Sequence, residues 1–287
     1  GLDIGANTPA SIEMELKINS NEEVVATPLS TLTSAVEEVA VNVSEAVVEQ
    51  RVAQAFDIPL AKAVDQSLTG YDPVATLGGT DSVEAVAVQP VYAANLMLVS
   101  LGHVIGNAAA ELARNVADVA RADIASGISA KGLSATLPAS LLPEADWDGI
   151  GQAAVLDAMT ELLAANADAR LTDATTRNVL LGKAMDKEGR EVVRTLVGSF
   201  STQTLQVNGT TKTYSTLLTG DLGVSDVNQF IAAIESLKDG RIEKVVELLT
   251  TEFVGDWQEA LNSKPTPSAL AKAMTVISVA TSSIEIP

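Results

Sequence analysis

Three carboxylates at alternating positions precede a glycine near the middle of the chain. Glu144, Asp146 and Asp148 are followed by Gly149, in a segment that leads into a predicted helix. Calcium takes several oxygen ligands around a sharp turn, and acidic residues at positions 1, 3 and 5 with glycine at position 6 supply part of such a loop. We therefore take Glu144, Asp146 and Asp148 as a candidate calcium site, and calcium as the one cofactor that the sequence suggests.

This pattern departs from an EF-hand loop at two places. Glu144 stands where Asp is usual, and Val155 occupies the position of the last, bidentate Glu, so a further acidic ligand would have to come from elsewhere in the chain. An acidic first turn that complements the dipole of the following helix explains the same residues without a metal.

Residues for other kinds of chemistry are scarce. The chain has no cysteine and a single histidine, His103, which lies in an uncharged stretch. We expect His103 to be a buried structural residue, although a carboxylate distant in sequence would give it the partner that a general base needs. Residues 149–154 have the glycine spacing of a dinucleotide-binding turn, but acidic residues precede them where a β-strand should stand. No catalytic residue is predicted, and we expect a protein that is not an enzyme.

Two segments fit the acceptor pattern for N-glycosylation, at Asn42 and at Asn208. The first lies at an expected helix start and the second in an expected hairpin turn. Both asparagines therefore have structural explanations, and modification stays open.

The composition limits the partners and the core. Lys and Arg total 18 against 37 Asp and Glu, a net charge of −19. Such a surface repels phosphate backbones, so nucleic acid is not expected as a partner. Hydrophobic residues make up 47% of the chain and aromatic residues 3%, so the core must consist of Ala, Val, Leu and Ile. Because the chain begins with Gly1 and carries no signal-like segment, we expect a processed or excised piece.

One stretch competes for a membrane interpretation. Residues 85–110 contain no Asp, Glu, Lys or Arg and are long enough to cross a bilayer. Polar residues interrupt the stretch, among them Gln89, Asn95 and Asn107, and each would cost free energy facing lipid. We expect a central buried helix and no membrane span.

The periodicity predicts a mainly α-helical protein, with a helical bundle-like core and minor β structure. A β-hairpin is expected at about 204–217, where Asn208-Gly209 lies between Thr- and Val-rich segments. Short strands are expected near both termini. We divide the chain into a strand and helical domain at 1–130, a connection at 131–149, and a second helical domain at 150–287. Helices are expected at about 28–40, from 44, at 85–125, 150–166, 173–185, 188–198, 226–238 and 241–253.

The terminal strands suggest how the protein assembles. Residues 12–18 alternate apolar and charged side chains, which is the period of a strand with one buried face. An unpaired strand edge can complete the sheet of a neighbouring subunit, whereas the two terminal strands can equally pair within one chain. The residues assigned to this assembly are Ile12, Met14, Leu16, Ile18, Ile284 and Ile286.

Several short motifs near the N-terminus carry a family resemblance. They are Thr27-Pro28-Leu29-Ser30-Thr31-Leu32, Val43-Ser44-Glu45-Ala46, Ala55-Phe56-Asp57-Ile58-Pro59 and Tyr71-Asp72-Pro73. Together they resemble a helical module of large secreted bacterial surface proteins, including RTX-type calcium-binding and adhesin-like chains. The resemblance covers about residues 10–75 and brings no catalytic residue. It implies an extracellular or cell-surface location and a structural or adhesive role.

Two functional hypotheses follow. The first is a non-enzymatic structural or adhesive module of a cell surface or filament, whose partners are copies of itself or other surface proteins. The alternative is a small-molecule-binding protein or a carboxylate-based enzyme, with residues 85–110 forming one wall of an apolar helical pocket.

Overall fold

The structure is a computed structural model that describes residues 2–3, 8–9, 27–59, 68, 82–142 and 144–262. It is mainly helical with one small antiparallel hairpin, which confirms the predicted fold class. The predicted strands at 12–18 and 276–286 lie outside the described residues. Near the N-terminus, β1 (Leu2–Asp3) pairs with β2 (Thr8–Pro9). The helices and strands that follow are α1 (Pro28–Val39), α2 (Glu45–Ala55), α4 (Ser82–Ala130), α5 (Trp147–Ala165), α6 (Ala174–Thr202), β3 (Thr204–Val207), β4 (Thr210–Thr213), α7 (Tyr214–Thr216), the π-helical turn η1 (Leu217–Asp221) and α8 (Val227–Asn262).

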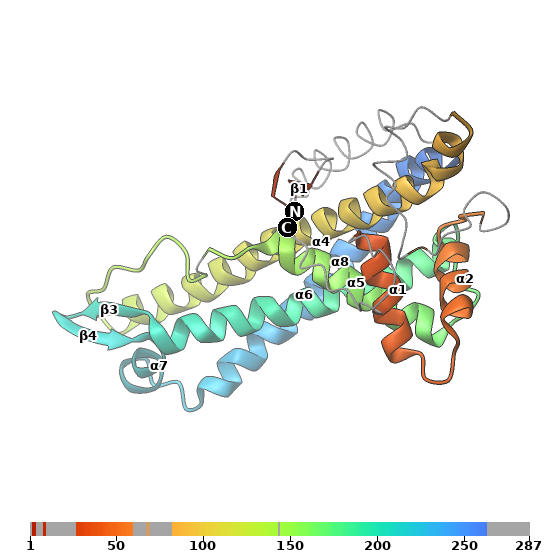
Figure 1. Ribbon diagram of the computed structural model, residues 1–287. Coiled ribbons are helices and arrows are strands. Elements are labelled where there is room, and N and C mark those ends of the chain that lie inside the picture. Colours follow the sequence, from red (N-terminus) through yellow and green to blue (C-terminus); the bar gives the residue numbers. More distant parts are fainter. Residues whose placement is uncertain are drawn as a thin grey trace.

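Three long helices set the shape of the molecule. Figure 1 shows α4, α6 and α8 running along one another as an elongated bundle, with the β3–β4 hairpin at one end and α1 and α2 beside α5. The helix α4 has 49 residues, which at ~1.5 Å rise per residue corresponds to about 74 Å. The bundle is therefore much longer than it is wide.

The start of α1 follows from its sequence. The Thr27 hydroxyl accepts a hydrogen bond from the Ser30 backbone N–H at 3.0 Å, and the Ser30 hydroxyl accepts one from the Thr27 backbone N–H at 2.8 Å. Pro28 occupies the first turn. The Leu29 N–H then donates to the Asn95 side chain at 2.8 Å, inside the protein. This bond joins the capped end of α1 to α4.

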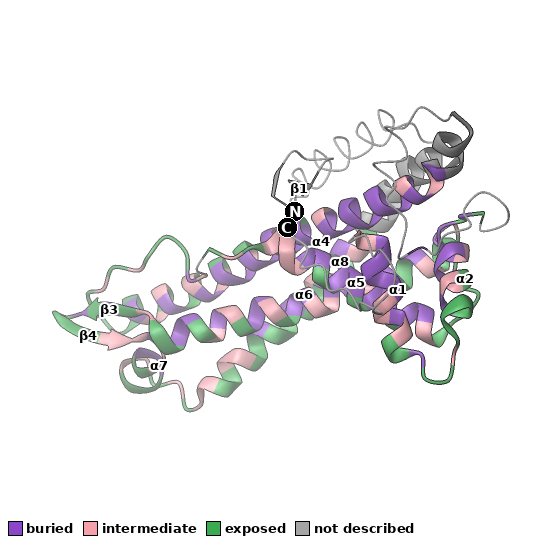
Figure 2. Ribbon diagram, in the orientation of Figure 1, coloured by how far each residue is buried: buried purple, intermediate pink, exposed green. Residues whose placement is uncertain are grey.

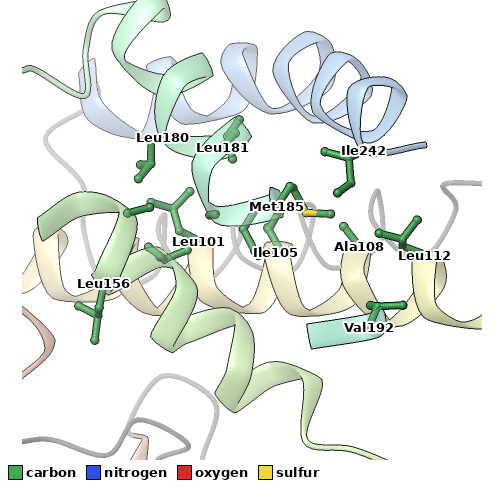
Figure 3. Packing of buried hydrophobic residues seen from close by; sticks show 14 of the residues in the cluster. Leu101, Ile105, Ala108, Leu112, Leu156, Leu180, Leu181, Met185, Val192 and Ile242 are labelled. Carbon is green, nitrogen blue, oxygen red and sulfur yellow. The ribbon is translucent and has the colours of Figure 1, made fainter. Parts of the chain in front are cut away.

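The hydrophobic core is a single cluster along the bundle (Figure 2). Figure 3 shows Met185 and Val192 of α6 gathered with Ile105, Ala108 and Leu112 of α4. The cluster includes residues on both sides of 131–149, among them Leu29 and Val245. The predicted domain boundaries stay predictions, but the buried side chains form one continuous core.

Close approach of α4 and α5 depends on glycine. A Cβ on Gly151 of α5 would lie 2.5 Å from the Gly102 carbonyl oxygen and 2.5 Å from the Gly106 nitrogen of α4. A Cβ on Gly106 would in turn meet the Trp147 carbonyl oxygen at 2.6 Å. The obstructing atoms are backbone atoms, which cannot rotate away. The two helices therefore touch at their backbones near the start of α5.

Two predicted helix ends are wrong. The helix α6 is continuous where two helices, 173–185 and 188–198, were predicted. The helix α8 is likewise continuous across the predicted helices 226–238 and 241–253. Gly240, which stands between the predicted helices 226–238 and 241–253, lies exposed inside α8 with nothing near the position of a Cβ. Glycine inside a helix costs about 1 kcal/mol relative to alanine. Burial of Ile234, Ile242 and Val245 on the same helix offsets this cost.

The hairpin has the expected turn. Asn208 and Gly209 have φ angles of 49° and 76°, as a two-residue turn between twisted strands requires. The Ser134 N–H donates to the Asn208 side chain at 2.9 Å, and Ala135 pairs with Val207, so the segment after α4 is attached to β3. The strand β4 ends at Thr213, earlier than the predicted boundary at 217, because the Thr213 hydroxyl caps α7.

One helix segment meets the length and composition of a membrane span. Among the described residues this is Pro90–Ala130, and 67% of its most apolar window is buried inside the protein. The core helix of a soluble protein gives the same signal. The absence of a membrane span stays a prediction.

Substitution of the glycine contact tests this packing. We expect Gly151→Ala to lower the free energy of unfolding by about 1–3 kcal/mol, because the added methyl group pushes α5 away from α4. The matched control is Gly198→Ala, since Gly198 is exposed within α6 and has nothing within 4 Å of the Cβ position. We expect the control to stabilise the protein by up to about 1 kcal/mol. Urea unfolding followed by circular dichroism measures both, and equal effects would contradict the close contact.

Candidate functional site

Asp146 caps α5. Its carboxylate accepts a hydrogen bond from the Gly149 N–H at 3.1 Å, and its carbonyl accepts one from the Ile150 N–H. Such a cap satisfies donors that the first turn of a helix leaves free. Glu144, two residues earlier, is exposed. The acidic segment thus has a structural role at Asp146, whether or not it also binds metal.

The structure brings Asp148 to the only histidine of the chain. Asp148 Oδ2 lies 3.2 Å from Nδ1 of His103, so the first turn of α5 is linked to the middle of α4. The link depends on Gly106, because a Cβ there would lie 2.9 Å from Asp148 Cα. His103 was expected to be buried, but its side chain keeps a quarter of its surface exposed. The reason is that the tight crossing puts His103 at the edge of the helix pair.

A carboxylate beside an imidazole is half of an acid–base arrangement. The carboxylate orients the ring, and the second nitrogen, Nε2, is buried. A nucleophile would complete the set. The nearest serine in the sequence, Ser100, donates its hydroxyl to the Leu96 carbonyl oxygen at 2.6 Å and is held within its own helix. The pair therefore serves as a link between α4 and α5.

Calcium binding stays a prediction. Among the residues whose side chains the structure describes, no group of three or more His, Asp or Glu side chains lies close enough together to hold a metal ion. Glu144, Asp146 and Asp148 precede α5 or begin it, with Asp146 on the cap and Asp148 beside His103. A calcium ion would have to compete with both of these contacts.

Ion pairs on the surface join α5 to α6. Glu161 lies 2.9 Å from the amino groups of both Lys183 and Lys187, and Asp157 lies 3.4 Å from that of Lys187. Hydrogen bonds from Lys187 and Lys183 lower the pKa of Glu161 from 4.5 to about 2. The stabilisation is present above pH 4.5 and is lost as the pH falls through about 2. Because these side chains are half-exposed, the contribution is small.

A buried acid was missed by the sequence reasoning. Glu188 in α6 has no solvent-exposed surface, and neither carboxyl oxygen has a hydrogen-bond partner. Burial, with a smaller effect from the charge of Glu191, raises its pKa from 4.5 to about 8. The helical period could have revealed it, because Glu188 falls on the apolar face between Met185 and Val192. The predicted helix break before 188 concealed this position.

The two possible glycosylation sites differ in structure. Asn42 is exposed in the turn between α1 and α2, with φ at 67°. Asn208 uses its side-chain oxygen to accept the Ser134 N–H. Both asparagines are exposed, and modification at either position stays a prediction. The assembly residues Ile12, Met14, Leu16, Ile18, Ile284 and Ile286 lie outside the described residues.

Comparison with family models, with curated proteins and with solved structures gives no match for this chain.

Substitution of single carboxylates distinguishes a role in capping α5 from a role in binding calcium. We expect Asp146→Ala to cost about 1 kcal/mol of stability with or without calcium, because the cap is lost. Glu144→Ala, the matched control, should change stability by less than about 0.5 kcal/mol in a chelator, since Glu144 is exposed and serves no cap. Thermal unfolding with millimolar calcium and with chelator measures both. A calcium-dependent rise in melting temperature that both variants abolish would establish the metal site.

A double-mutant cycle measures the link between α4 and α5. With His103→Gln, Asp148→Asn and the double variant, we expect a coupling energy of about 0.5 kcal/mol, as for other partly exposed pairs. The coupling should grow on acidification, because a charged imidazole makes an ion pair with the carboxylate. Zero coupling in urea unfolding at both acidic and neutral pH would contradict the contact.

Proposed function

We propose that this chain is a non-enzymatic structural module of an extracellular or cell-surface assembly, with copies of itself or other surface proteins as partners. The observation that carries the proposal is the elongated bundle of α4, α6 and α8 (Figure 1). A spacer or filament unit needs length together with stiffness. One continuous hydrophobic cluster along the bundle gives it both, because bending would have to open packed side chains.

The composition agrees with this role. The core is built mostly from Ala, Val, Leu and Ile, and the net charge of −19 keeps the protein soluble. The contact between α4 and α5 relies on backbone proximity at Gly102, Gly106 and Gly151. The resemblance of residues 10–75 to modules of secreted bacterial surface proteins is the support for the location.

Assembly by strand exchange is the mechanistic form of the proposal. Its support is the alternating pattern of residues 12–18 and the apolar residues of 284–286. A strand edge presents unpaired N–H and C=O groups that can complete a neighbour's sheet. Pairing of the two segments within one chain is the competing arrangement.

The alternative function, binding or conversion of a small molecule, has one observation in its favour. His103 and Asp148 form a carboxylate–imidazole pair at the α4–α5 crossing. A thermal-shift screen with metabolites tests it, because ligand binding to the native state raises the melting temperature. A shift in the native protein that Asp148→Asn removes would favour this function over the structural one.

Light scattering tests the structural proposal. We expect the purified protein to form assemblies larger than one chain, and Leu16→Asp to return it to a monomer with unchanged helical circular dichroism. The matched control is Glu15→Gln, which changes the opposite face of the same predicted strand and should leave the mass unchanged.

The same measurement distinguishes the competing arrangements. A monomer at all concentrations, with calcium and with chelator, would overturn self-assembly. General unfolding of Leu16→Asp would instead favour pairing of the terminal strands within one chain. A mass that depends on calcium would direct attention to Glu144, Asp146 and Asp148.

A further inference from the structure

Glu188 lies at the centre of the buried face of α6. It follows Met185 by one turn and precedes Val192 by another, and both of these residues are buried. Figure 3 shows Met185 and Val192 among apolar side chains of α4, with Ile105, Ala108 and Leu112 labelled. The Glu188 side chain is 0% exposed, and both carboxyl oxygens lack hydrogen-bond partners. An ionised carboxylate in this position would be costly, because within the part of the chain that the structure describes no opposite charge or donor compensates for the lost water.

Charged groups on the surrounding elements are engaged elsewhere. On α5, Asp157 and Glu161 bind Lys187, which lies on α6 itself. On α8, Lys238 pairs with Asp239 at 3.0 Å, and Arg241 donates to Asn115 of α4 at 3.0 Å.

The remaining charged side chains that the structure describes give Glu188 no cationic partner. On α4, His103 lies beside Asp148 and Glu111 pairs with Arg114. Among the described residues, Glu191 on α6 is the charge that acts on Glu188, and as a second acid it favours the protonated form.

We propose that Glu188 is a proton-operated latch in the core, which keeps α6 packed against α4 while protonated and loosens this packing when it ionises. The inference is independent of the proposed structural function. A neutral carboxylic acid among Val, Met and Ala side chains leaves a single hydrogen-bond donor without a partner, which costs a moderate free energy. The ionised form costs much more, so water has to enter the bundle to solvate it. Loosening in α6 would alter the stiffness of the whole bundle, since α6 contacts α4, α5 and α8.

The direction of the pH effect follows from linkage. The folded protein keeps the Glu188 proton up to about pH 8, where burial has placed the pKa, whereas the unfolded chain releases it near 4.5. Between these values the folded state binds one more proton than the unfolded state, so stability falls as the pH rises. The contribution of Glu188 to stability is greatest below pH 4.5 and is lost in full above about pH 8.

The primary experiment follows unfolding in urea from pH 5 to 9. For the native sequence, the unfolding constant should rise about tenfold for each pH unit between about 5 and 8 from this group alone. Glu188→Met should abolish that component and increase stability at high pH, because a buried acid is replaced by an apolar side chain of similar length. Glu188→Gln, which keeps the shape and cannot ionise, provides a second variant if Met disturbs the packing. The matched control is Glu243→Gln, which removes an exposed carboxylate from α8.

A second readout separates a latch from a purely global effect. The chain lacks cysteine, so Ala184→Cys places a single buried thiol one turn from Glu188. The rate of thiol labelling is measured for Ala184→Cys alone and for Ala184→Cys combined with Glu188→Met. The ratio of the two rates is free of the pH dependence that comes from ionisation of the thiol itself. We expect the ratio of the two rates to rise about tenfold per pH unit up to about 8. A global opening would accelerate labelling equally at a thiol placed on α1, such as Thr33→Cys.

Three results would overturn the proposal. One is an equal pH dependence of stability for the native sequence, Glu188→Met and Glu188→Gln. Another is a Glu188 carboxyl that titrates near its ordinary value of 4.5 in the folded protein, observed by carbon-13 NMR with the Glu188→Gln spectrum as the assignment. Equal acceleration at Ala184→Cys and Thr33→Cys would overturn the local latch.

Discussion

The backbone contact between α4 and α5 is the constraint on which the rest of the molecule depends. Gly102 and Gly106 on one helix face Gly151 on the other, at distances that no side chain would allow. Because the helices meet at their backbones, α5 enters the bundle directly beside α4, and α6 can return along both. Asp148 then reaches His103, and the α5–α6 ion pairs form on the outer side.

The core shows how a protein with few aromatic residues achieves a long, continuous interior. Small and branched side chains allow close helix spacing, and contact area accumulates along the length of the helices instead of around a few rings. Gly189 plays a similar part between α6 and α8, where a Cβ would meet the side chain of Ile242 at 2.4 Å. Glu188, the neighbouring residue, is an exception in this apolar surface, which makes its protonation state important for the packing of three helices.

Some of the fold could be predicted from the sequence and some could not. The cap at Thr27, the Asn208-Gly209 turn and the mainly helical class followed from local signals, because caps and turns depend on adjacent residues. The continuity of α6 and α8 could not be predicted in this way, because burial against neighbouring helices outweighs a local helix-breaking signal in the sequence. At the candidate site, Asp146 was recognised as acidic but not as the cap, and the partner of His103 was hidden because a tertiary crossing creates it.

Native-state hydrogen exchange, resolved by residue, tests most directly whether the two sides of the α4–α5 contact form one cooperative unit. Amides near Ile105 in α4 and near Met159 in α5 should exchange with the same free energy of opening, equal to that of global unfolding, because neither helix keeps its core without the other. A lower opening free energy for α5 and α6 than for α4 would mean that the halves of the chain unfold separately, and would contradict a single bundle held together at the glycine contact.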